Sequence, residues 1–202
     1  MEEIGLFPLG IVLLPSERVP LHIFEPRYRE LIGECIEEDR EFGLLYADEE
    51  GIRDVGTRAR VAAILERFDD GRLNILVEGL QRFTVERMTD GRAYLTAEIG
   101  DVEDEDGVVV DDETRVAATG AFRALATLAG AEAEVNESSP VLSFELAAQV
   151  ELAADDKQFL LESRSEQERL ERVAELLDDA RKTLIATREL GEVAKRNGSR
   201  PH

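Results

Sequence analysis

The sequence predicts an α+β protein in which a small N-terminal β-barrel with one inserted helix precedes a C-terminal helical bundle. Apolar residues alternate with period two through most of residues 41–103, as expected for strands with one buried face. Beyond about residue 114 they recur every three or four residues, which is typical of amphipathic helices. The acidic segment 104–113 separates the two patterns.

The first hundred residues contain several short apolar runs bounded by turn residues. Leu6–Leu14 is interrupted by Pro8 and Gly10, so it predicts two short or bent strands, and Pro15 and Pro20 frame a turn after it. The remaining expected strands are Glu41–Ala47, Thr57–Phe68, Arg72–Glu78, Gln81–Met88 and Ala93–Val102.

Glycines divide and bend these strands. Asp70-Gly71 and Asp90-Gly91 are hairpin-turn dipeptides, because both residue types tolerate the positive φ that tight turns require. Gly79 separates two apolar runs without a loop long enough for a hairpin, so it indicates a bulge or a sharp bend. Short strands bent by glycine favour a small barrel over a flat sheet.

One helix is inserted into the strand-rich half. It is expected to begin near Pro26, since proline suits the first position of a helix, with Glu25 as a candidate cap. Its buried stripe is predicted to be Tyr28, Leu31, Ile32, Cys35 and Ile36. Cys35, inside this stripe, is interpreted as a small core residue and not as a reactive thiol.

The division that follows is a barrel lobe (1–103), an acidic linker (104–113) that could include a short Val108–Val110 strand, a helical lobe (114–196) and a disordered tail (197–202). Four helices are expected in the helical lobe. Their markers are the stripe Ala118, Phe122, Leu125 and Ala129; a start at Ser139-Pro140 running to Leu152; the segment Asp155–Glu162; and a capping box of Ser165 and Glu168 before the stripe Leu170, Val173, Leu177, Ala180 and Leu184.

No catalytic or cofactor-binding pattern is found. The two histidines are His22, inside an apolar stretch, and His202 at the C-terminus, which are too few for a zinc site. Glycine-rich phosphate loops and a G-x-S-x-G nucleophile motif are absent from the sequence. We therefore expect no enzyme activity, no metal and no cofactor.

The charge is strongly acidic, at −21. Such a field repels nucleic-acid phosphates and anionic membranes, so neither is an expected partner. No apolar run approaches the roughly 18 residues of a membrane span, and the N-terminus lacks the pattern of a signal peptide. With the single Cys35, these features predict a cytoplasmic protein.

Three stretches nevertheless form a specific pattern. The first is Phe7-Pro8-Leu9 with Val12–Pro15 and Val19–Tyr28. The second is Val55-Gly56-Thr57, Asp70-Gly71 and Leu76–Phe83, and the third is Asp156-Lys157-Gln158, Leu160–Glu162 and Glu168-Arg169-Leu170. Together, over about residues 4–190, the chain resembles the N-terminal substrate-binding domain of Lon proteases.

This resemblance implies a PUA-like β-barrel plus a helical bundle that binds polypeptides. The expected function is that of a non-catalytic, free-standing recognition module, an adaptor for unfolded or apolar protein segments that acts with a protease or chaperone. The alternative is an RNA-binding PUA-like module, which the acidic charge disfavours. The candidate peptide-binding residues are Leu14, His22, Phe24, Tyr28, Glu78 and Arg82. We also expect Glu78 and Arg82 to pair within the barrel.

The charge generates a first prediction. The purified protein is expected not to bind generic RNA measurably at about 0.15 M salt, because a net charge of −21 repels the phosphate backbone. A filter-binding titration measures this, and a submicromolar complex would contradict it.

Overall fold

A single strand of 17 residues, β6 (Leu73–Thr89), organises the sheet. Along one edge it pairs with β5 (Val55–Arg67). Along the other it pairs first with β2 (Arg18–Ile23) and then with β7 (Thr96–Asp101), all antiparallel. The two predicted strands Arg72–Glu78 and Gln81–Met88 are therefore one strand.

The strands β1 (Glu2–Leu9) and β3 (Phe42–Asp48) link β7, on one side of β6, to β5 on the other. β1 pairs antiparallel with β7 and parallel with β3. β3 in turn pairs with β5, and the two-residue β4 (Gly51–Ile52) adds to β3. The result is a seven-stranded, mostly antiparallel sheet in which the path β1-β7-β6-β5-β3 returns to β1.

Gly79 marks the point where β6 changes partner from β2 to β7. Its N–H donates to the Glu17 carbonyl and its own carbonyl accepts from Ser16 N–H, both at 2.9 Å. A Cβ at this position would lie 2.1 Å from the Leu14 carbonyl oxygen. The β5–β6 register is irregular between Gly79 and Arg82, in agreement with the predicted bend.

The N-terminal segment differs from expectation. β1 is one strand, and the chain from Gly10 to Glu17 forms no strand because its backbone is used in the loop that packs on Gly79. In that loop Leu14 N–H donates to the Glu17 carboxylate at 2.9 Å. Pro20 lies within β2 and does not frame a turn.

The inserted helix α1 (Pro26–Glu38) begins as predicted and buries Tyr28, Leu31, Ile32 and Cys35, with Ile36 partly buried. Glu25 occupies the N-cap position, but its side chain makes no capping bond; it pairs with Arg27 at 2.8 Å instead. Burial raises the pKa of the Cys35 thiol to about 11, consistent with a core residue.

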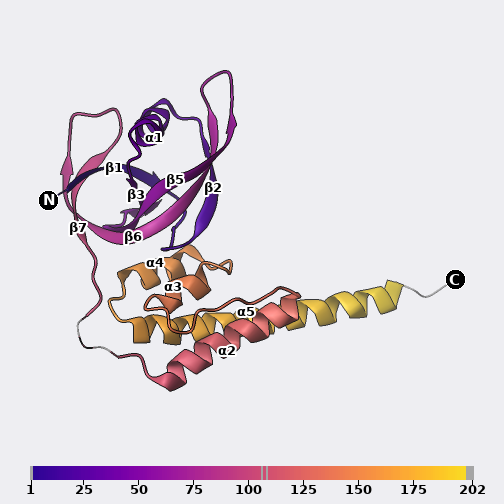
Figure 1. Cartoon of the computed structure of the whole chain (residues 1–202). Coiled ribbons are helices and arrows are strands. Elements are labelled where there is room, and N and C mark those ends of the chain that lie inside the picture. The colour runs from indigo at the N-terminus through magenta and orange to yellow at the C-terminus, as the bar shows by residue number, and fades with distance from the viewer. Residues whose placement is uncertain (1, 106, 108, 199–202) are drawn as a thin grey trace. The chain divides into compact units, whose positions relative to one another are not determined.

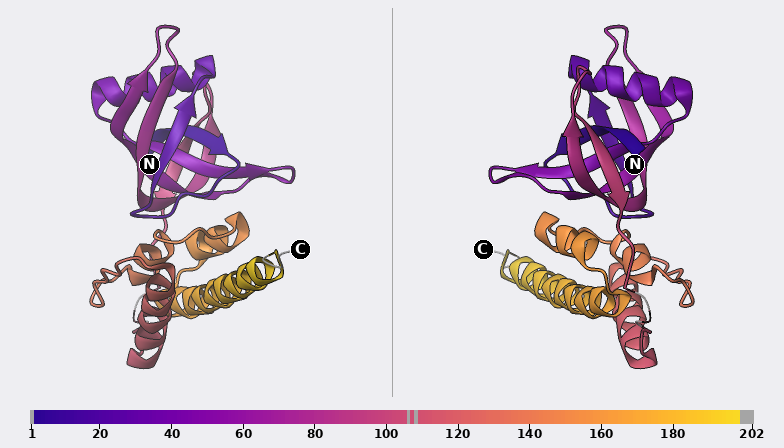
Figure 2. Two further views of the ribbon diagram at one scale, coloured as in Figure 1. Left: turned by 90° about the vertical axis from the view of Figure 1, so that its right-hand side faces the viewer. Right: turned by 90° about the vertical axis from the view of Figure 1, so that its left-hand side faces the viewer.

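The structure is a computed structural model that describes residues 2–105, 107 and 109–198. The chain divides into two compact units, Met1–Asp106 with Ala147–Ser165, and Gly107–Leu146 with Glu166–His202. The first contains the sheet, α1 and α4 (Ala154–Glu162), with the two helices at opposite ends of the sheet (Figures 1 and 2). Residues 147–165, expected in the helical lobe, thus belong to the sheet unit.

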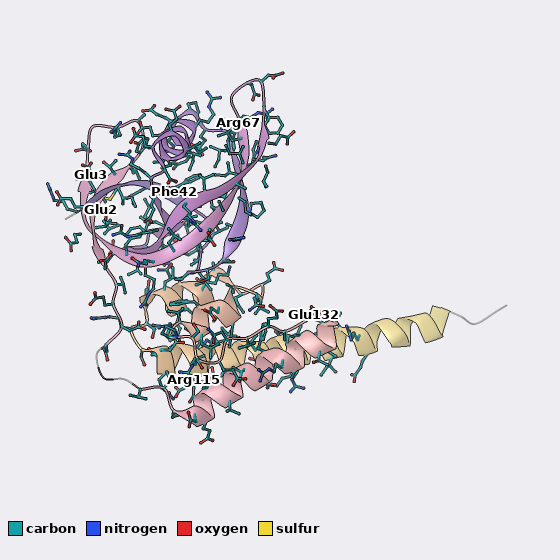
Figure 3. All side chains as sticks on the ribbon, in the orientation of Figure 1. Glu2, Glu3, Phe42, Arg67, Arg115 and Glu132 are labelled. Atoms are coloured by element: carbon teal, nitrogen blue, oxygen red, sulfur yellow. The ribbon has the colours of Figure 1, made fainter. Side chains whose placement is uncertain are left out.

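The sheet unit has a continuous apolar interior. Phe42, labelled in Figure 3, is fully buried beside Leu13, Ile32 and Ile75 in the larger cluster. A second cluster surrounds Phe83. The predicted alternation of the strands therefore produces the expected buried face.

The second unit contains α2 (Asp112–Ala129), α3 (Leu142–Ala147) and α5 (Glu166–Gly198), with α2 packed on α5. The stripe on α5 is buried at Leu170, Val173 and Leu177. The fully buried Arg169 donates to Glu166 at 2.7 Å and to Ser143 Oγ at 3.1 Å, which links α5 to α3.

Several helical expectations are corrected. α3 is much shorter than the expected helix from Ser139 to Leu152, and Ala129 at the end of α2 is exposed. No strand forms at Val109–Val110; Val108 is outside the described residues. α5 continues through Asn197 and Gly198, while residues 199–202 of the expected tail are outside the described residues. Among the described helices, none is both long and apolar enough to cross a membrane.

The close approach at Gly79 generates a second prediction. Gly79→Ala is expected to lower the free energy of unfolding by about 3 kcal/mol, because the loop carbonyl must move to admit a methyl group. The matched control is Gly33→Ala in α1, where a Cβ meets nothing within 4 Å; better helix propensity is expected to make it neutral or stabilising. Urea unfolding of both variants measures the difference, and equal stability would contradict the prediction.

Candidate polypeptide-binding surface

The strands β2, β6 and β5 form a three-stranded ribbon with two different faces. On the inner face Leu73, Ile75 and Val77 of β6 are buried in the core. On the outer face Asn74, Leu76 and Glu78 are only partly buried, because alternate residues of a strand point to opposite sides. The register of the three strands defines rows of side chains across this outer face.

The row at one end of the outer face is ionic. Arg18, Glu78 and Arg60 lie opposite one another in register. The Glu78 carboxylate accepts from Arg60 at 2.5 Å and from Arg18 at 2.9 Å. These hydrogen bonds, from Arg60 first and then from Arg18, hold the pKa of Glu78 below its ordinary value.

The row nearer the β5–β6 turn is polar. His22, Asn74 and Glu66 are in register across the three strands. The His22 Nδ1 and Asn74 Oδ1 atoms are 2.6 Å apart, and Asn74 Nδ2 donates to Glu66 at 2.9 Å. The ladder fixes the His22 ring in place on the surface.

Between the two polar rows lies an apolar row of Pro20, Leu76 and Ala63. Leu65 is the extra residue of a bulge between Ile64 and Glu66, and its side chain is 56% exposed. Bulges commonly redirect a side chain in this way.

An aromatic group adjoins these residues. The His22 ring stacks on Phe24 with centroids 5.8 Å apart and meets Phe68 edge-on at 5.9 Å. Phe24 is 57% exposed, which is unusual for so large an apolar side chain. We name the outer apolar patch the ribbon surface and define it by its members: Pro20, His22, Phe24, Leu65, Phe68 and Leu76.

The ribbon surface includes a hollow. The hollow measures about 370 Å³ and is lined by Pro20, Leu21, His22, Leu65, Glu66 and Asn74. It is large enough for a few apolar side chains and contains few charged groups. Its chemistry therefore suits apolar or aromatic side chains and not phosphate or metal ions.

The turn beside this surface is anchored. The Asp70-Gly71 dipeptide forms the predicted turn. The Gly71 N–H donates to the Phe68 carbonyl at 3.0 Å, and Gly71 has a positive φ of 85°. Arg29 of α1 donates to the Asp70 carbonyl at 2.7 Å. Figure 1 shows the turn projecting beyond the sheet, and Figure 3 labels Arg67 at the end of β5 next to it.

The six predicted site residues do not form one site. His22 and Phe24 lie together on the ribbon surface, and Glu78 lies on the same outer face in the ionic row. Leu14 is fully buried, and Tyr28 is buried with its ring 4.1 Å from Phe7. Desolvation raises the Tyr28 pKa, as expected for a core phenol.

Arg82 is also buried, and it does not pair with Glu78. Its guanidinium donates to the carbonyls of Leu161 at 2.9 Å and Ser163 at 2.6 Å, and to Asp104 at 2.5 Å. The expected pair is wrong because the irregular register between Gly79 and Arg82 breaks the alternation that would place both side chains on one face. Arg82 instead joins β6 to the C-terminal end of α4 and the residue that follows it.

The sequence prediction missed Pro20, Leu65, Phe68 and Leu76. A signal for one of them was present: Val61–Leu65 is five consecutive apolar residues in a strand that otherwise alternates. Such a run on an edge strand indicates a bulge or an exposed apolar side chain. Among the residues that the structure describes, no group of three or more His, Cys, Asp or Glu side chains is arranged to hold a metal ion.

The family model of the ATP-dependent protease La (LON) substrate-binding domain matches residues 3–179. The chain belongs to this family. The Lon protease of Anaeromyxobacter dehalogenans is 29% identical over 203 residues, covering 91% of this chain and 24% of that protein. The Lon protease of Methylocella silvestris is 30% identical over 201 residues, covering 92% of this chain and 25% of that protein.

Solved structures are similar in fold. The Lon N-terminal domain protein from Xanthomonas campestris has a TM-score of 0.68 and 26% identity, covering 86% of this chain and 97% of that one. The N-terminal domain of a Mycobacterium avium complex Lon protease has a TM-score of 0.65 at 18% identity, covering 90% and 98%. The chain spans only about a quarter of the length of the two curated Lon proteases described above.

The position of Arg82 in this Lon-type domain generates a third prediction. Arg82→Ala is expected to destabilise the protein by about 3 kcal/mol, because it leaves two carbonyls and a carboxylate without their donor. Arg87→Ala is the control, since Arg87 is 68% exposed and pairs with Glu98 at the surface; a much smaller loss of stability is expected. Denaturant unfolding compares them, and equal losses would show that Arg82 is not a structural anchor.

Proposed function

We propose that this Lon-type domain recognises apolar segments of unfolded polypeptides through the ribbon surface. The observation that carries the proposal is the exposure of Phe24 and Leu65 beside a hollow whose apolar lining is Pro20, Leu21 and Leu65. Clustered exposed apolar side chains of this kind mark interaction sites. Membership of a substrate-binding family supports a polypeptide as the ligand.

The role that we infer is non-catalytic. The domain would act as an adaptor that presents captured segments to a protease or a chaperone in the cytoplasm. The side chains of the ribbon surface support capture: they offer apolar contact and a hydrogen-bonded histidine, and no nucleophile paired with a base.

We also infer that the sheet is a small PUA-like barrel followed by a helical bundle. The return of the strand pairing to β1 supports the barrel, and the packing of α2 on α5 supports the bundle. RNA binding, the alternative for a PUA-like fold, is not proposed, because the two arginines of the outer face are both bonded to Glu78. They are held by a carboxylate that would repel a phosphate.

The proposal is tested by fluorescence anisotropy with labelled apolar-aromatic peptides. Micromolar binding that persists to about 0.3 M salt is expected, because apolar contacts are not screened. Phe24→Asp and Leu65→Asp should each weaken binding about tenfold or more without changing the melting temperature, since both side chains are exposed.

Met88→Asp is the matched control, as Met88 is an exposed apolar residue of β6 outside the ribbon surface (46% exposed). It should leave the affinity unchanged. Binding only to basic peptides, lost by about 0.3 M salt, would overturn the proposal. So would equal effects of the ribbon and control variants.

A further inference from the structure

The free edge of β5 is a separate feature of the same ribbon. β3 pairs with β5 only at Thr57–Ala59, because the chain before Phe42 leaves the sheet toward α1. Among the strands of the described part of the chain, none pairs with this edge beyond Ala59. β5 continues to Arg67, so about eight residues, or roughly 26 Å, of strand edge have no strand partner.

The middle of this edge carries no charged side chain and no proline, although two bulges interrupt it. Natural edge strands are commonly protected by charged side chains or proline. Here charged residues lie only at the two ends of the unpaired segment, at Arg60 and at Glu66–Arg67. Of the residues between them, Ala62–Leu65 are uncharged and exposed. An edge that is left apolar in this way can accept another strand.

A groove runs beside this edge. Its volume is about 400 Å³, and its walls are Arg60–Ile64 of β5 on one side and the end of α1 with Asp39–Glu41 on the other. Cys35 and Ile36 of α1 also line it. Val61 and Ile64 are in register with the core residues Val77 and Ile75, so the groove continues the inner, apolar face of the ribbon.

We propose that an extended apolar peptide adds to the free edge of β5 as a further strand. The unpaired backbone requires an occupant with its own backbone N–H and C=O groups, which selects a polypeptide. Alternate side chains of that strand would enter the groove against Ile36 and Ile64, and the others would face outward. The inference rests on the proposed polypeptide recognition and specifies how the segment is held.

Charge at the groove favours a cationic flank on the peptide. Arg40 is bonded to Glu34 and Glu38, and Arg60 is bonded to Glu78, so both arginines are already neutralised. Glu41 lies only within 3.9 Å of an Arg58 nitrogen, at the limit of an ion pair. Together with Asp39, it leaves the rim acidic, so lysine or arginine next to the apolar segment is preferred over glutamate.

The same charge argues against a second copy of this chain as the occupant. Edge-to-edge pairing of two copies would bring the acidic end of one α1 near its equivalent, and each chain carries a net charge of −21. Bulges at Ala62 and Leu65 also interrupt the edge, which limits an added strand to a few ladder bonds. Weak, reversible binding of a single segment is the consequence.

The test uses the whole chain and a labelled peptide of alternating valine and threonine with a lysine at each end. Two isomers of this peptide carry N-methyl groups at alternate residues, so that each isomer lacks the backbone N–H donors along one of its two edges. If the peptide adds to β5 as a strand, the isomer whose methylated edge faces β5 cannot donate these hydrogen bonds. At least one isomer should therefore bind about tenfold more weakly than the parent peptide. A peptide with glutamate at both ends should also bind more weakly than the parent.

Ile64→Lys should weaken binding of the parent peptide about tenfold, since it places a charge in the groove. Ile52→Lys, at an exposed isoleucine of β4 (45% exposed), is the matched control and should not. Both variants should keep the wild-type melting temperature.

The outcomes separate this inference from the proposed function. If both methylated isomers bind like the parent while Phe24→Asp still weakens binding, strand addition is wrong and recognition by the ribbon surface stands. If no apolar peptide binds at all, the proposed function fails and the inference fails with it. A concentration-dependent dimer that Ile64→Lys dissociates would identify a second copy as the occupant and overturn the inference.

Discussion

The partner change along β6 is the constraint on which the sheet depends. A strand that pairs with β2 at its start and β7 at its end must leave room for the chain that enters between them, and that room exists because residue 79 is glycine. The loop before β2 hydrogen-bonds to Gly79 on both its N–H and its C=O. Placement of β2, and with it the ribbon and its outer face, follows from this single close approach.

As a result, one face of the ribbon is buried in the core and the other is partly exposed. The inner face contributes Ile75 and Val77 to the core, which makes the ribbon rigid. The outer face is ordered by hydrogen-bonded polar rows on either side of an apolar row. The hydrogen bonds of His22 and Asn74 hold these two side chains in place before any ligand arrives, which lowers the conformational entropy that they would lose on binding.

Much of the architecture could be predicted from periodicity, because alternation and helical stripes report which face of an element is buried. The α1 stripe from Tyr28 to Cys35 is an example. Glycine at position 79 indicated a bend, but local sequence could not show that the strand continues, since that depends on a distant loop. Likewise, the motif marks Arg82 as a candidate site residue, whereas its contacts are made with carbonyls some 80 residues later in the chain.

The donor–acceptor contacts of Arg82 have a consequence for synthesis of the chain. The sheet unit is discontinuous: its last segment, 147–165, follows a stretch that belongs to the other unit. A nascent chain that has emerged only to residue 146 holds the Arg82 guanidinium but not the Leu161 and Ser163 carbonyls that bind it. On the ribosome, the strands can therefore pair early, yet the sheet unit reaches its final stability only after α4 has left the exit tunnel.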